Sequence, residues 1–69
     1  MNWNHRVVRT NDADGVTRYH IHEVYYTNGK IMGRTESPVT PYGETKKELK
    51  LTLKRMLRAL EQPTIKGKG

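Results

Sequence analysis

Cysteine and phenylalanine are both absent from this chain of 69 residues, and only 33% of its residues are hydrophobic. Without cysteine, neither a disulfide nor a thiolate metal site can stabilise the fold, and the composition suits a reducing compartment. No apolar run approaches the roughly 20 residues needed to cross a bilayer, and the opening MNWNHRVVRT lacks the apolar segment of a signal peptide. The sequence therefore predicts a small cytoplasmic domain that makes no contact with a membrane.

Catalytic and phosphate-binding signatures are also missing. Ser37 is the only serine, and it precedes a proline in a segment that offers no general base. Gly43 stands alone before a predicted helix, so there is no glycine-rich phosphate loop. We predict that the chain is not an enzyme and that it has no catalytic residue and no cofactor.

The segment HIHE raises the question of a metal site. His20 and His22 lie two residues apart and share one face of a strand, and His5 could approach from a neighbouring strand. Glu23 points to the opposite face, and no cysteine is available as a further ligand. Two partly exposed strand histidines are the more common explanation of so short a spacing. We therefore predict no metal site.

Positive charge is in excess, and it is unevenly distributed. The formal net charge is +6, yet residues 1–45 hold five basic and five acidic residues. Residues 46–69 hold eight basic and two acidic residues, so the whole excess lies in the last third of the chain. Such asymmetry concerns partners or solubility rather than the fold.

Alternating hydrophobicity and turn residues predict three strands. They lie at residues 3–9, 17–26 and 30–37. The turn cluster at 11–15 separates the first two, and a connector with two prolines follows the third at 38–44. Asn28 and Gly29 are the strongest short hairpin signal, because a type I′ turn needs a positive φ at both central positions.

One helix is predicted after the connector, with a stop at Pro63. Thr45 is a good N-cap, and Glu48 three residues later completes a capping box. At about 100° per residue, the apolar residues form one stripe that should pack on the sheet. This predicted stripe consists of Leu49, Leu53, Met56 and Leu60, with Leu57 near its margin.

The predicted fold is α+β: a three-stranded antiparallel meander followed by one C-terminal helix packed on one sheet face (β-β-β-α). Residues 1–63 form this single domain, and residues 64–69 form a flexible basic tail. Because one helix covers only one face, the second face of the sheet is expected to be open to water or to a partner.

The sequence leaves open which face packs on the helix. One side of the long strand carries Tyr19, Ile21, Glu23 and Tyr25, and the other carries His20, His22, Val24 and Tyr26. A bulge near residues 22–23 would bring Ile21 and Val24 to the same side. In either arrangement aromatic side chains stay on the open face, where they favour an interface such as a homodimer.

The predicted helix also carries a basic face. Its candidate binding residues are Lys47, Lys50, Leu51, Lys54, Arg55 and Arg58. The cations could meet phosphates, which would make nucleic-acid binding steeply salt-dependent, or they could form a solvated face that keeps a small protein soluble. A protein partner would use Leu51, which is apolar amid the charges. A membrane surface is disfavoured because the apolar stripe is needed for the core.

Four segments form a recognisable pattern over residues 3 to about 63: WNHRVVR, HIHEVYY, SPVTPYGET and RMLRALEQP. They resemble a family of short uncharacterised bacterial proteins with W-N-x-R-V, I-H-E-V-Y-Y, P-V-x-P-x-G-E-T and M-L-x-A-L-x-x-P. More loosely, three strands followed by GETKKEL look like the partial double-stranded-RNA-binding-type fold of HicB-type antitoxins. The family resemblance implies no activity, and a likeness of fold carries no function by itself.

The sequence as a whole favours a small non-enzymatic binding module. Its expected partner is a protein, which it meets through the open sheet face or the basic helix. The alternative is nucleic-acid binding through the basic helix and the C-terminal tail.

Overall fold

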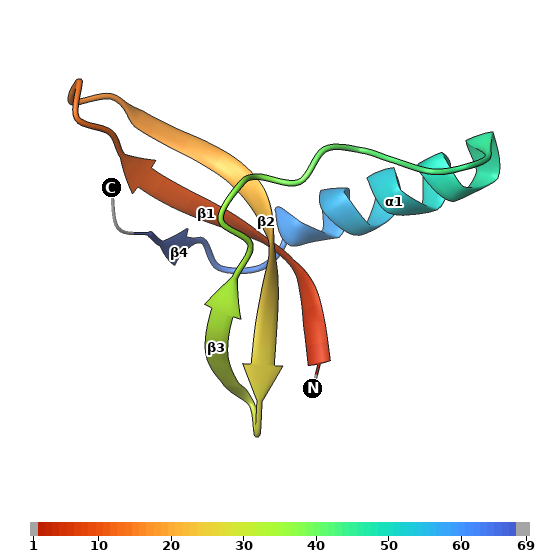
Figure 1. Ribbon diagram of the computed structural model, residues 1–69, viewed down its shortest axis with the longest axis horizontal. Helices are drawn as coiled ribbons and strands as arrows, with labels where there is room; N and C mark the ends of the chain where they lie inside the picture. The colour runs from red at the N-terminus through yellow and green to blue at the C-terminus, as the bar shows by residue number, and fades with distance from the viewer. Residues whose placement is uncertain (1, 68–69) are drawn as a thin grey trace.

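A computed structural model describes residues 2–67, which form four strands and one helix (Figure 1). The elements are β1 (Asn2–Asn11), β2 (Thr17–Thr27), β3 (Lys30–Arg34), α1 (Lys46–Ala59) and β4 (Ile65–Lys66). The strands lie in the order β3-β2-β1-β4, with β4 parallel to β1 and the other pairs antiparallel. The predicted α+β class is confirmed, with three antiparallel strands and one helix. The fourth strand makes the sheet mixed.

The two hairpins follow from local turn chemistry. β1 and β2 pair without a register shift along all 10 residues of β1. Asn28 and Gly29 have φ values of 52° and 75°, which confirms the predicted turn between β2 and β3. The sequence left open whether a bulge lies near residues 22–23. The irregularity in β2 lies instead between Tyr25 and Tyr26, in its pairing with β3.

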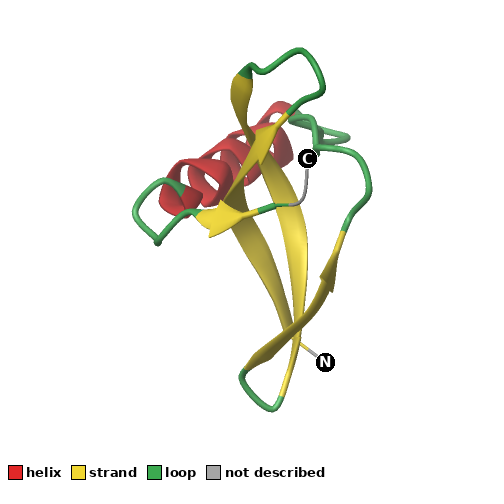
Figure 2. Ribbon diagram, turned by 90° about the vertical axis from the view of Figure 1, so that its left-hand side faces the viewer, coloured by secondary structure: helices red, strands yellow, loops and turns green. Residues whose placement is uncertain are grey.

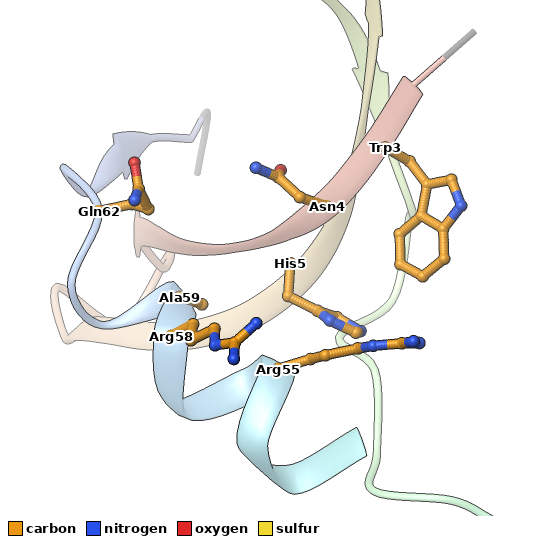
Figure 3. A pocket seen from close by; sticks show the side chains of 7 residues that line it. All are labelled: Trp3, Asn4, His5, Arg55, Arg58, Ala59 and Gln62. Atoms are coloured by element: carbon orange, nitrogen blue, oxygen red, sulfur yellow. The ribbon is translucent and has the colours of Figure 1, made fainter. Parts of the chain in front are cut away.

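The side of the sheet that carries Ile21 lies toward α1. Directly opposite residues of an antiparallel pair share a face, and the register places Val7 opposite Ile21 and His5 opposite Glu23. Figure 3 shows the His5 side chain directed from β1 toward α1. The alternate residues of β2, which include His22, therefore lie on the second face.

The second face of the sheet is buried at its centre, so the prediction of an open face is wrong there. Val8, Val24 and His22 are 0%, 1% and 4% exposed. The sheet is strongly curled (Figure 2), and Gly67 lies against the Val8 side chain. Arg6 donates from Nη2 to the carbonyl oxygen of Pro63 at 2.6 Å, which holds the segment after α1 on this side. That segment covers apolar groups that three strands alone would have left to water.

β4 lies within the segment 64–69, which the sequence predicts to be a flexible tail. It pairs with Val8 and Arg9 of β1. The Gly67 N–H also donates to the carbonyl oxygen of Arg9, at 2.7 Å. The last two residues of the predicted tail lie outside the described residues.

α1 begins where the sequence predicts. The Glu48 N–H donates to Thr45 Oγ1 at 3.1 Å, so Thr45 is the N-cap. The Glu48 carboxylate accepts from the Glu44 N–H at 2.9 Å, one residue before the position that a capping box would use. The helix ends at Ala59, ahead of Pro63. No helix within residues 2–67 has both the length and the apolar character needed to cross a membrane.

The side of α1 that packs on β1 differs from the predicted one. Met56 and Ala59 are buried, whereas Leu53 and Leu60 of the predicted stripe are exposed. The C-terminal turns of α1 lie over the sheet, and its N-terminal turns extend beyond it beside the connector (Figure 1). A helix approaches a strand most closely where its side chains are small, and Ala59 provides such a position. The predicted stripe was built from large apolar residues only. It therefore left out Ala59 and was centred on a different side of α1.

His22 predicts that the fold is sensitive to acid. Its Nδ1 lies 2.9 Å from the carbonyl oxygen of Thr35, so the neutral imidazole donates a hydrogen bond there. Burial lowers the pKa of His22, the bond to Thr35 opposes this shift, and nearby Arg34 adds to it. The unfolded chain then binds more protons than the folded chain. The free energy of unfolding should therefore fall as the pH drops below about 6.5, the ordinary pKa of histidine.

Urea unfolding at a series of pH values from about 4.5 to 8 measures this dependence. His22→Gln removes one titrating group and should make the curve shallower, while His5, whose pKa is also lowered by burial, retains part of the dependence. His20→Gln is the matched control, because His20 lies on the same strand face and is exposed. Equal pH dependence in the parent and in His22→Gln would contradict the prediction.

Candidate functional site

The candidate residues of the basic face are all exposed on α1, but they do not form one surface. They are Lys47, Lys50, Leu51, Lys54, Arg55 and Arg58. The three lysines lie on the side of the helix opposite the buried residues. Arg55 and Arg58 instead border β1, across from Trp3 and His5 (Figure 3). The structure therefore separates a group of free lysines from a pair of arginines that faces a strand.

An exposed apolar surface, which the sequence placed in the core, runs along α1. Leu53, Leu57 and Leu60 are 48%, 62% and 64% exposed. We call these three residues the leucine stripe. At spacings of four and three residues they lie on one side of the helix, next to the side that packs on β1. By the same geometry Lys50 and Lys54 run along the outer border of the leucine stripe.

Leu51 lies away from the leucine stripe. It is 47% exposed and lines a second cavity of about 530 Å³, formed with the connector before α1. Tyr42 and Gly43 of the connector border this cavity, and Thr52 Oγ1 donates to the carbonyl oxygen of Tyr42 at 2.9 Å. Leu51, the predicted contact with a protein partner, therefore lies on the side of α1 that faces the connector.

A cavity of about 400 Å³ lies between β1 and α1, and we call it the β1–α1 cavity (Figure 3). Its lining comprises Trp3, Asn4 and His5 of β1, Arg55, Arg58 and Ala59 of α1, and Gln62 after the helix. Trp3 and His5 are two residues apart on β1, so both side chains lie on the same face of the sheet, the one that faces the helix. Their rings pack edge to face at 5.4 Å with an interplanar angle of 88°. An aromatic wall and a cationic wall therefore face each other.

Among the described residues, two cationic side chains and no acidic one line the β1–α1 cavity. Burial lowers the pKa of His5, Glu23 on the neighbouring strand opposes this shift, and Arg55 adds to it. Within residues 2–67 the ion pairs are those of Arg18 with Asp12 and Asp14. Arg55 and Arg58 take no part in them, so their guanidinium groups are available to an anion.

The strand histidines lie as the sequence places them, on one face of β2. His20 is exposed, but Nδ1 of His22 is engaged by the carbonyl oxygen of Thr35. His5 lies on the opposite face, opposite Glu23. In the described part of the chain, no three histidine or acidic residues are grouped so that they could hold a metal ion.

Comparisons of the chain with protein-family models, with curated proteins and with solved structures find no match. Its chemistry is therefore inferred from two surfaces of α1. One is the leucine stripe with its lysine border, and the other is the β1–α1 cavity with its paired arginines.

Proposed function

We propose that the chain is a non-enzymatic protein-binding module that docks an acidic amphipathic helix on the leucine stripe. The observation that carries the proposal is the exposure of Leu53, Leu57 and Leu60 side by side on one helix. Single exposed leucines are ordinary on a protein surface, but a contiguous apolar row bordered by charge is typical of a binding surface.

The spacing of the leucine stripe suits a helical partner. Positions i, i+4 and i+7 present one continuous ridge, which the apolar side of a second helix can pack against. The leucine stripe stays accessible although the C-terminal turns of α1 lie over the sheet (Figure 1), because Leu53, Leu57 and Leu60 are each about half exposed or more. Docking would remove three half-exposed leucines from water, and this burial is the main source of affinity.

Charge determines which kind of helix fits. Lys50 and Lys54 border the leucine stripe, and both are exposed. A partner with acidic residues beside its apolar ridge would pair with them, which steers association and fixes the register. A second copy of this chain would instead bring its own lysines to the same border, and like charges disfavour that pairing. The acidic helix is therefore the better occupant, and a homodimer is an outcome of the test.

A peptide-display selection against the folded chain tests the proposal. Selected peptides should carry apolar residues at helical spacing and a negative net charge. Leu57→Ser should weaken binding of such a peptide at least about tenfold, because it places a hydroxyl in the centre of the apolar ridge. The measurement is calorimetric titration of the parent and the variant.

Leu51→Ser is the matched control. Leu51 is exposed to nearly the same extent as Leu53 but lies on the other side of α1, so its loss should change affinity less than about twofold. If Leu51→Ser weakens binding as much as Leu57→Ser, the partner docks on the basic face instead. Self-association in sedimentation that Leu57→Ser abolishes would assign the surface to a second copy.

Nucleic acid is the competing partner, and salt distinguishes it. Binding carried by lysines and arginines weakens steeply as counterions compete. We expect any binding of random duplex DNA to disappear between about 50 and 200 mM salt. Tight duplex binding that survives the higher salt concentration would reverse the order of the two functions.

A further inference from the structure

The β1–α1 cavity lies on another side of α1 from the leucine stripe, and it has the composition of a small-molecule site. Its volume of about 400 Å³ falls within the range of about 300–1,000 Å³ that is common for ligand pockets. We propose that it binds a nucleoside monophosphate, with the phosphate held by Arg55 and Arg58 and the base stacked on Trp3 (Figure 3).

The phosphate position follows from the two arginines. Residues three apart are neighbours on a helix surface, and both side chains line the cavity, Arg58 beside Ala59 and Arg55 beneath His5 (Figure 3). A guanidinium group is planar and donates two parallel hydrogen bonds to a phosphate. The ion pairs within residues 2–67 involve neither arginine. Both positive charges would attract an anion in the cavity, and they would not attract a neutral ligand.

The base position follows from the aromatic wall. Trp3 is 48% exposed, although it lies beside the helix. His5 packs perpendicular to the indole at 5.4 Å, which fixes the orientation of the ring. A planar base can then stack on the exposed part of the indole, and such stacking accepts any of the bases because each has a π face. Figure 3 shows the Arg55 side chain running beneath Trp3 and His5, so stacking and charge are available at the same end of the cavity.

Adenosine monophosphate is a suitable probe. Trp3 is the single tryptophan, so quenching of its fluorescence reports binding at the cavity, and calorimetry measures the affinity independently. Arg58→Gln and Trp3→Leu should each weaken binding at least about tenfold, because each removes one of the two anchors. Adenosine and inorganic phosphate, which each carry half of the probe, should each bind at least about tenfold more weakly than the whole nucleotide.

Lys54→Gln is the matched control, since it removes one positive charge from the same helix at a position away from the cavity. It should change the affinity less than about twofold. Equal losses in Lys54→Gln and Arg58→Gln, or equal affinities for inorganic phosphate and the nucleotide, would show general electrostatic attraction and overturn the proposal. So would an NMR spectrum of the parent chain in which His5 and the Trp3 indole do not shift on addition of the nucleotide.

A nucleotide can be free or part of a single strand, and a short single-stranded oligonucleotide distinguishes the two sources. Tighter binding of the strand that is lost in Trp3→Leu assigns the cavity to a strand. Binding no tighter than that of the mononucleotide assigns it to the free ligand. Leu57→Ser, which interrupts the leucine stripe, should leave nucleotide binding unchanged, so either function can fail without the other.

Discussion

Met56→Ala is expected to lower the free energy of unfolding by about 2–5 kcal/mol, the usual cost of truncating a buried methionine. Met56 is the large apolar side chain that α1 buries against the sheet. A domain of this size has a small core and little stability to lose. Much of the variant should therefore be unfolded at ambient temperature. Circular dichroism during thermal and urea unfolding measures the loss.

Leu60→Ala is the control for this prediction. Leu60 is exposed, so its truncation should change stability by no more than about 0.5 kcal/mol. The sequence alone ranks the two residues together, because both belong to the predicted apolar stripe. A large loss in Leu60→Ala, or none in Met56→Ala, would mean that α1 packs with the side that the periodicity predicts.

Gly43→Ala is expected to destabilise the fold by about 1–3 kcal/mol, the usual cost of inserting a methyl group where there is no space. A Cβ at Gly43 would lie 2.8 Å from the carbonyl carbon of Glu48 and 2.9 Å from Leu49 Cα. These are backbone atoms of α1, and they cannot move without shifting the helix. The connector would have to leave the first turns of α1, which depend on it because they extend beyond the sheet.

Gly33→Ala is the matched substitution. A Cβ at Gly33 would meet no atom within 4 Å, and alanine restricts the unfolded chain more than glycine does. This variant should therefore be as stable as the parent or slightly more stable, whereas Gly43→Ala is less stable. Urea unfolding of the two variants gives the comparison. Equal stability of both would show that the connector does not touch the helix.

The parts of the fold that were predictable from the sequence depend on short-range chemistry. The turn at Asn28 and Gly29 needs only two residues that accept a positive φ, and the start of α1 needs only the hydroxyl of Thr45 beside the Glu48 N–H. Which side of α1 is buried depends instead on how the long connector positions the helix against the sheet. Ala59 is central to that contact, but a helical wheel that considers only large apolar residues does not include it.

The candidate site divides in the same way. The cations of α1 were evident because they are concentrated in the last third of the chain. Their division into a lysine border and an arginine pair was not evident from the sequence. It depends on the fold, in which β1 brings Trp3 and His5 beside Arg55 and Arg58, about fifty positions later in the chain. One signal was available: Trp3, His5 and Val7 occupy every second position of one strand, which places their side chains on the same face.

The outer strands of the sheet determine how this molecule can associate. Natural sheets avoid adding strands from other chains by keeping their edges short, charged or irregular. β3 has five residues and begins with Lys30, and β4 has two. Beyond β3, the backbone of β2 is occupied by the N–H groups of Thr35 and Val39. Strand addition is therefore disfavoured along β3 and β4, and backbone pairing with another chain would have to use the part of β1 before Val8, which β4 does not cover.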